Sequence, residues 1–285
     1  MMIIDYFPLN NDPLAFCIAV ALMLCFVESI KLIASTCTRS TKNEIPKNPN
    51  GKDKHLSNTN RKGNTRKVLH ILAGPLFILL TTLLTTTPTG NMFACMIVSL
   101  MTIKFFLVGT GIVKGFYLVD SDITLMSRSG TKEELLLGPT FYGMSITYVT
   151  YLNWKSIAWC SGILALCLGD GFAEIVGTWQ NVQPFNRRIP WNSGKSIVGT
   201  LACMWFTCFG IFLSFLVSFL LEFEDWEPEN FGFPGFSSGT NIVGVAVIGG
   251  VLAGLLESVP LQDMDNVLVC VGVNMFVFSF TSASL

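Results

Sequence analysis

The sequence predicts an all-α protein, a polytopic transmembrane helical bundle of about eight spans, and three observations lead to this prediction. Only 13% of the 285 residues are Asp, Glu, Lys or Arg, about half the share of ~25% that is usual in soluble domains, while 51% are hydrophobic. The mean hydropathy is +0.56. Long apolar runs recur along the chain, and a span needs roughly 20 mostly apolar residues to cross a bilayer.

Seven apolar runs supply the predicted spans: residues 14–34, 68–103, 138–152, 156–177, 196–221, 242–256 and 267–285. The run 68–103 is too long for one span, and the turn-forming residues Thr87, Pro88, Thr89 and Gly90 divide it in two, which brings the total to eight helices. Pro139 is expected in the first turn of a helix that begins at Gly138, because a proline there removes no intrahelical hydrogen bond.

The distribution of basic residues predicts the orientation of the bundle. If the N-terminus is lumenal, the cytoplasmic segments 35–67, 114–137, 178–195 and 258–266 contain 15 of the 18 Lys and Arg residues. On the opposite side, the segment 222–229 is acidic. Basic residues near helix ends stay in the cytoplasm, so a lumenal N-terminus is predicted.

Three segments follow from this topology. Residues 1–34 form an N-terminal membrane anchor helix, because the first twelve residues lack the basic character of a signal or transit peptide. Residues 35–67 form a basic, flexible cytoplasmic linker that lies against anionic lipid or serves only as a topology signal. Residues 68–285 form the polytopic membrane domain.

Composition also excludes several kinds of site. The formal net charge of −1 argues against nucleic-acid binding, which needs a concentrated excess of Lys and Arg. The nine cysteines form no C-x-x-C pair and the chain has two histidines, so a structural zinc site is not expected. A bound metal should therefore be hard and held by oxygen atoms.

The segment Gly169-Asp170-Gly171 carries the first candidate site. Fifteen residues separate Lys155 from Asp170, about 22 Å of helix, so Asp170 should lie just inside the cytoplasmic boundary. Glu174 lies four residues further on, on the same helical face. The two glycines leave room for a ligand, and Mg²⁺ between Asp170 and nucleotide phosphates would neutralise a carboxylate at that depth. The alternative is a pair of solvated carboxylates at a helix end.

The loop 186–196 carries the second candidate site. Gly194, Lys195 and Ser196 precede an apolar helix, where backbone N–H groups, the helix dipole and an ammonium favour phosphate. It is not a Walker A loop, because Ile189 stands where that pattern has glycine. The other polar residues of the loop that we expect to contact a nucleotide are Arg187, Arg188, Asn192 and Ser193.

Two more polar clusters lie at predicted cytoplasmic ends. Arg128 and Lys132, in the hydroxyl-rich segment 127–134, are candidates for phosphate contacts or ordinary solvated residues. Glu257 follows an uncharged run, whereas Asp265 and Asn266 are residues of the kind that cap a helix N-terminus.

These motifs together resemble the CTP-dependent isoprenoid-alcohol kinases, the phytol and farnesol kinases with the dolichol kinases as more distant relatives. The likeness runs from about Arg66 to the C-terminus. Two departures stand out: Thr178-Trp179-Gln180 replaces basic residues and glycine, and Glu174 replaces a more frequent Asp. The matching elements, in order, are Arg66-Lys67-x-x-His70, the segment 126–139, Gly169 to Gly177, Pro190 to Ser196, Glu257 to Pro260 and Asp265-Asn266.

The resemblance implies that residues 68–285 are a membrane kinase domain that transfers the γ-phosphoryl group of CTP to an isoprenoid alcohol of phytol, farnesol or dolichol type. It implies Mg²⁺ on Asp170 with Glu257 or Asp265, and His70 or Glu174 as general base. The nucleotide would be contacted by residues of three segments: Arg128 and Lys132; Gly169 and Gly171; and Arg187, Arg188, Asn192, Ser193, Gly194, Lys195 and Ser196.

Two other functions share parts of this pattern. A CTP-using lipid-phosphate cytidylyltransferase would release pyrophosphate rather than CDP. A transporter would use Asp170, Glu174 and Lys104 to line a path, but the chain has no internal repeat. The endoplasmic reticulum is the expected host membrane, with the active site facing the cytosol; a plastid membrane, the chain length of the alcohol and a homodimeric state remain open.

Overall fold

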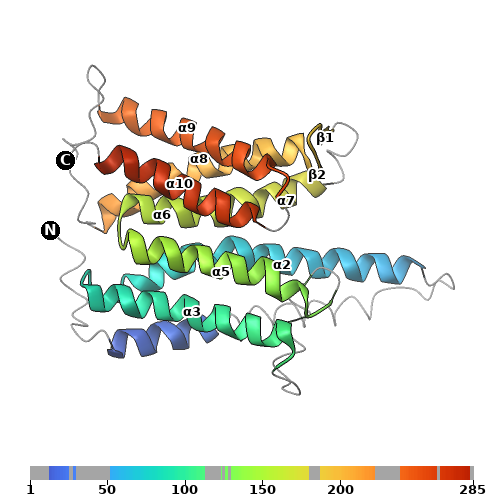
Figure 1. Cartoon of the computed structure of the whole chain (residues 1–285), viewed down its shortest axis with the longest axis horizontal. Coiled ribbons are helices and arrows are strands. Elements are labelled where there is room, and N and C mark those ends of the chain that lie inside the picture. Colours follow the sequence, from blue (N-terminus) through green and yellow to red (C-terminus); the bar gives the residue numbers. More distant parts are fainter. Residues whose placement is uncertain are drawn as a thin grey trace.

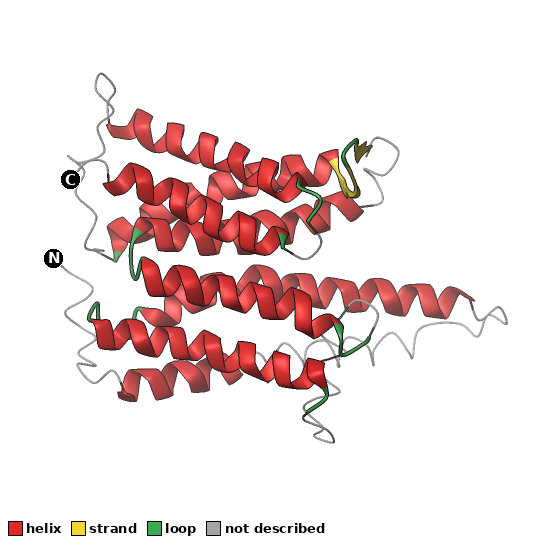
Figure 2. Cartoon of the chain, in the orientation of Figure 1, coloured by secondary structure: helices red, strands yellow, loops and turns green. Residues whose placement is uncertain are grey.

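The computed structural model of the chain is a bundle of long helices with one small hairpin (Figures 1 and 2). It describes residues 13–25, 28–29, 52–112, 123, 126–127, 130–179, 187–221, 238–261 and 264–282. After a short helix Pro13–Cys25, the elements are α2 (Lys52–Thr81), α3 (Pro88–Thr110), α5 (Glu134–Leu152), α6 (Ile157–Leu164), the π-helix η2 (Ala165–Asp170), α7 (Gly171–Thr178), β1 (Arg188–Ile189), β2 (Asn192–Ser196), α8 (Ile197–Leu220), α9 (Ser238–Ser258) and α10 (Asp265–Ser282).

The helices form two groups whose axes run in roughly the same direction (Figure 1). One group contains α2, α3 and α5 with the helix Pro13–Cys25, and the other contains α6, α8, α9 and α10. The hairpin, the end of α7 and the connection from α9 to α10 meet at one end of the bundle. The polar motifs of the sequence, which lie in these elements, therefore gather at that end.

Four helices in the described part of the chain are long and apolar enough to cross a membrane: Pro88–Thr110, Ile157–Thr178, Ile197–Leu220 and Asn241–Ser258. The helices Pro13–Cys25 and Asp265–Thr281 are apolar but shorter. The prediction of a helical, multi-pass membrane bundle is thus confirmed. The count of eight spans and the lumenal N-terminus remain predictions.

The predicted break near Gly90 is confirmed. Helix α2 ends at Thr81, and α3 begins at Pro88 with Thr87 as its N-cap. The Thr87 hydroxyl accepts a hydrogen bond from the Gly90 amide at 3.3 Å. Proline at the first helical position fits because its missing N–H would have no intrahelical partner.

Two helix starts differ from the prediction. Helix α2 begins at Lys52, inside the segment 35–67 that was predicted as a flexible linker. Helix α5 begins at Glu134, so Pro139 lies inside the helix rather than in its first turn. Pro139 cannot donate to the carbonyl of Leu135, and the hydroxyl of Thr140 donates to it instead at 2.8 Å. This substitute bond allows the helix to pass through the proline.

The central element of the bundle is the continuous run of α6, η2 and α7. Ser156 caps it, because its hydroxyl accepts from the amide of Trp159 at 3.0 Å. The π-helix packs against α2, α8, α9 and α10 and ends at Asp170. Such π segments are rare and frequently occur at functional sites.

The bundle has an apolar core on both sides of this central run. Trp159 is fully buried, and its ring contacts those of Phe77 and Trp154 edge to face. Its indole N–H donates to the hydroxyl of Thr150 at 3.0 Å. Because the central run is held by this core, Asp170 at its end has a defined position.

Candidate active site

A cavity of about 1020 Å³ opens at the end of the bundle where the polar motifs meet. Its polar part is lined by side chains from α2, η2, α7, β1, β2, α9 and α10. The polar lining includes Arg66, Lys67, His70, Asp170, Glu174, Arg188, Asn192, Lys195, Glu257, Asp265 and Asn266.

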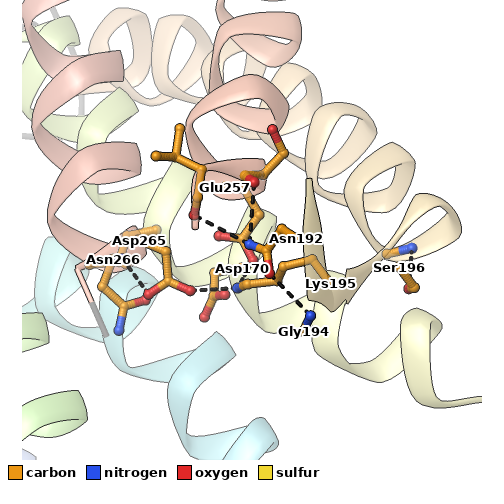
Figure 3. Close-up of polar contacts among 12 residues, drawn as sticks. Asp170, Asn192, Gly194, Lys195, Ser196, Glu257, Asp265 and Asn266 are labelled. Carbon is orange, nitrogen blue, oxygen red and sulfur yellow. Dashed lines mark hydrogen bonds and ion pairs between the residues drawn. The ribbon is translucent and has the colours of Figure 1, made fainter. Parts of the chain in front are cut away.

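Three carboxylates form the centre of this polar part. Asp170, Glu257 and Asp265 each place one oxygen within 4.8 Å of the others, although they come from three separate stretches of the chain. Lys195 reaches into the same cluster, where its ammonium pairs with Glu257 and lies 2.5 Å from Asp265 Oδ2 (Figure 3). The three residues that the resemblance implies as metal ligands therefore lie together, with Lys195 between them.

The electrostatics of this cluster favour cations. Burial disfavours the charged form of Lys195, but the surrounding carboxylates outweigh it and raise the pKa of the ammonium above its usual value. Glu257 is 2% exposed, and its Oε2 has no hydrogen-bond partner among the described residues. A buried, unpartnered carboxylate oxygen is costly, and a hard divalent cation with oxygen ligands would remove that cost. The donor set therefore fits Mg²⁺.

His70 contacts the same cluster from α2. Its Nε2 lies 3.1 Å from Asp170 Oδ2 and 3.2 Å from the carbonyl of Leu166. Both neighbours are acceptors, so Nε2 carries the proton and Nδ1 is the basic atom of the neutral ring. The ring packs on Tyr142, whose hydroxyl donates to the His70 carbonyl at 3.2 Å.

Glu174 joins α7 to α2. Its carboxylate forms an ion pair with Arg66, and Lys67 donates to the hydroxyl of Thr178 at 2.9 Å. Asp170 and Glu174 both line the cavity, as their spacing predicts. They have different partners, however, because Asp170 faces His70 whereas Glu174 faces Arg66.

The hairpin of β1 and β2 positions Lys195. The strands are antiparallel, and the side-chain amide of Asn192 donates to the backbone carbonyls of Ser258 and Val259 at 3.2 and 3.3 Å. These bonds attach the hairpin to the end of α9, next to Glu257. Lys195 therefore reaches the carboxylates from strand β2, which is hydrogen-bonded to the end of α9. The sequence predicted instead that Lys195 lies at the start of a helix.

The segment Gly194-Lys195-Ser196 joins strand β2 to the start of α8. Gly194 and Lys195 belong to β2, and Ser196 caps α8 by accepting from the Gly199 amide at 3.1 Å. In Figure 3, Ser196 lies away from the carboxylate cluster. The start of α8 nevertheless lines the same cavity through Ser196, Gly199 and Thr200, so phosphate binding at this helix N-terminus stays a prediction.

The glycines around Asp170 contact helices rather than the cavity. A Cβ atom at Gly169 would lie 2.3 Å from the hydroxyl oxygen of Thr207, and one at Gly171 would lie 2.4 Å from Cγ1 of Ile71. Their role is to let η2 and α7 approach α8 and α2 closely. The expectation that they leave room for a ligand is corrected by this packing.

Several predicted phosphate contacts lie away from the cavity. Arg187 and Ser193 are exposed and do not line it, whereas Arg188 does and donates to the Gly194 carbonyl at 3.3 Å. The ammonium of Lys132 lies beside Gly111 at the end of α3. Arg128 lies outside the described residues.

Three further residues line the cavity although the sequence predicted no site role for them. Arg66 and Lys67 belong to the element Arg66-Lys67-x-x-His70 of the resemblance, and this membership could have indicated a role in the site. Tyr142 lies in an apolar helix, where nothing in the sequence distinguishes it from a core aromatic residue.

Comparison with known proteins yields relatives of one kind. The chain is 32% identical over 203 residues to a farnesol kinase, chloroplastic, of Arabidopsis thaliana, which covers 70% of this chain and 60% of that protein. It is 30% identical over 210 residues to a probable phytol kinase 2, chloroplastic, of Oryza sativa subsp. japonica, covering 72% and 62%. The chain is a homologue of the isoprenoid-alcohol kinases. The resemblance to farnesol and phytol kinases is thereby confirmed, whereas the CTP donor and a dolichol-type substrate stay predictions.

The similarity to these kinases covers only part of each chain. A probable phytol kinase 3, chloroplastic, of Glycine max is 34% identical over 138 residues, 48% of this chain and 41% of that protein. The chain thus spans less than two thirds of these kinases. No family model and no solved structure matches it. The relatives are named as chloroplastic, which gives no support to the expected endoplasmic reticulum.

Proposed function

We propose that the chain is an integral-membrane kinase that transfers the γ-phosphoryl group of CTP to the hydroxyl of an isoprenoid alcohol. The observation that carries the proposal is a single cavity with a carboxylate and lysine cluster at one end and an apolar section between α2, α3 and α5. Phosphoryl transfer needs charged groups around the phosphates, whereas a lipid alcohol needs an apolar site. The farnesol and phytol kinases among the relatives support the same substrate class.

Mg²⁺ would be held by Asp170, Glu257 and Asp265, whose oxygens are close enough to share one ion. When bound, Mg²⁺ neutralises charge on the nucleotide phosphates. Lys195 lies in this cluster and Arg188 also lines the cavity, and we assign both to phosphate oxygens.

The reaction forms one bond and breaks one bond. The alcohol oxygen bonds to the γ-phosphorus, the bond from that phosphorus to the β–γ bridging oxygen breaks, and CDP leaves. The hydroxyl proton passes to a base, and we assign His70 Nδ1 to this role because Glu174 is already bound by Arg66.

The proposal is tested with purified protein in lipid nanodiscs, Mg²⁺, γ-labelled CTP or ATP, and geraniol, farnesol, geranylgeraniol, phytol and a dolichol. We expect a labelled prenyl monophosphate with CDP as the second product, and loss of activity with EDTA that excess Mg²⁺ restores. Release of pyrophosphate from CTP with a lipid phosphate would indicate a cytidylyltransferase instead. No product with any alcohol and either nucleotide would overturn the proposal.

The active site is further proposed to face the cytosol, because most basic residues lie in the segments predicted at that end of the helices. Imaging of a tagged chain against reticulum and plastid markers decides the host membrane.

A further inference from the structure

The apolar section of the cavity has a regular construction. Helix α2 lines it with His70, Ala73 and Phe77, which recur at helical spacing on one face. The equivalent stripes are Val98, Met101, Thr102 and Phe105 on α3 and Pro139, Tyr142, Gly143 and Ile146 on α5. Each stripe extends over seven residues, so the section is about 10 Å deep at 1.5 Å per residue.

The polar and apolar parts of the cavity meet at His70 and Tyr142. His70 contacts Asp170 on its polar side, and Tyr142 packs against the His70 ring. Beyond this pair, the lining continues with Ala73, Leu76 and Phe77 of α2. A ligand with its hydroxyl at His70 therefore has an apolar path in one direction along α2.

The apolar section also has a floor. Phe77, Val98 and Ile146 are 2%, 7% and 4% exposed and belong to the apolar core. The next residues on the same three stripes are buried and do not line the cavity: Leu80, Ala94 and Val149. The cavity thus ends against packed side chains rather than continuing between the helices.

We infer that this section binds the hydrocarbon chain of the alcohol, and that Phe77, Val98 and Ile146 determine how long that chain can be. The inference rests on the proposed function. The whole cavity, about 1020 Å³, lies at the upper end of the range for drug-sized ligands and must also accommodate nucleotide phosphates. The floor therefore favours short prenols over long ones and excludes a dolichol.

The first test narrows the section. Ala73→Phe places a ring in the cavity, and Leu72→Phe places the same ring at the neighbouring position, where the side chain is 42% exposed and outside the cavity. We expect Ala73→Phe to lower kcat/KM for geranylgeraniol relative to geraniol by about tenfold or more, since an apolar pocket discriminates by that order. Leu72→Phe should leave the ratio unchanged. Equal ratios in both variants would overturn the inference.

The second test lowers the floor and does not depend on the first variant folding. Val98→Ala removes two methyl groups from the floor, and Leu100→Ala shortens a residue on the same helix that is 51% exposed. We expect Val98→Ala to raise the preference for geranylgeraniol over farnesol several-fold and Leu100→Ala to leave it unchanged. If Val98→Ala also leaves it unchanged, the floor does not set chain length.

The two proposals fail in different ways. If the wild-type protein phosphorylates no alcohol, the proposed function is wrong. The proposed function stands and only the inference about the apolar section is wrong in two cases. One is that the wild-type protein phosphorylates dolichol as well as farnesol. The other is that Ala73→Phe and Val98→Ala both keep the wild-type preference among alcohols of different length.

Discussion

At the residue scale, Lys195 and its carboxylates form a compact group of opposite charges. A lysine ammonium and a divalent cation are alternative partners for the same oxygens of Glu257 and Asp265. Nucleotide phosphates give the ammonium another partner, because phosphate oxygens accept its hydrogen bonds as carboxylates do. Under the proposed function, Lys195 would hold these carboxylates together until metal and nucleotide bind.

Asp170→Asn tests the metal site. The substitution keeps the size of the side chain and removes its charge, so we expect turnover to fall about 100-fold or more because a group that acts on the transition state is lost. Labelled product per minute in nanodiscs is the measurement, and Glu133→Gln, an exposed carboxylate outside the cavity, is the control. Turnover close to wild type in Asp170→Asn would remove Asp170 from the mechanism.

Lys195→Met separates catalysis from metal binding. The methionine keeps most of the apolar stem but removes the ammonium that pairs with Glu257 and Asp265. We expect turnover to fall about 100-fold, while Mn²⁺ in the absence of nucleotide binds at least as tightly as in wild type, since a competing cation is gone. Electron paramagnetic resonance of free Mn²⁺ measures the binding. Weaker Mn²⁺ binding would show that Lys195 does not compete for the site.

At the scale of elements, contacts between segments place the site. The π-helix ends at Asp170, the hairpin holds Lys195, and the end of α9 holds Glu257. The bonds from Asn192 to the end of α9 and the ion pair from Arg66 to Glu174 tie these elements to one another. Site geometry thus depends on connections as well as on the reacting groups.

The Arg66 and Glu174 pair is tested by exchange of charges. Arg66→Glu should lower kcat/KM about tenfold, because it places two carboxylates together and releases α2, which carries His70, from α7. The double variant Arg66→Glu and Glu174→Arg restores the ion pair with its charges exchanged. We expect it to recover at least half of the activation free energy that the single variant Arg66→Glu loses. Failure to recover, with normal thermal stability, would indicate that the Glu174 carboxylate itself acts in the reaction.

At the scale of the whole molecule, the charged residues of the cavity lie at one end of the bundle, which we call the charged end. The hairpin lies at the charged end, and the turn between α2 and α3 lies at the other (Figure 1). Lateral access for a lipid and aqueous access for a nucleotide require the charged end to lie at a membrane surface. The orientation of that surface follows from the predicted topology.

Cysteine labelling tests that topology. In a cysteine-free background, we expect Ser193→Cys in the hairpin to react with an impermeant maleimide from the cytosolic side of sealed vesicles. Thr86→Cys, in the turn after α2, should react only after the membrane is permeabilised, because one membrane thickness separates the two ends. Reaction of both residues from the same side would contradict the arrangement of spans.

Much of the site was predictable because polar residues in an apolar chain are conspicuous. Asp170, Glu257 and Asp265 stand out against uncharged runs, and each lines the cavity. The glycines beside Asp170 were misjudged, because a sequence does not show whether a glycine faces a ligand or a neighbouring helix. For Lys132, which the sequence left open as a phosphate contact or a solvated residue, the fold places the ammonium beside Gly111 and outside the cavity lining.

The sequence by itself determined the helical membrane architecture, the break before Pro88 and the chemical types of the charged residues. These depend on local hydropathy, turn chemistry and composition, which act over a few residues. Only the tertiary structure decided that three distant carboxylates meet at Lys195, that Glu174 pairs with Arg66, and that an apolar section leads from His70 to Phe77. Such contacts depend on how helices pack, and packing is determined by many side chains at once rather than by any one stretch.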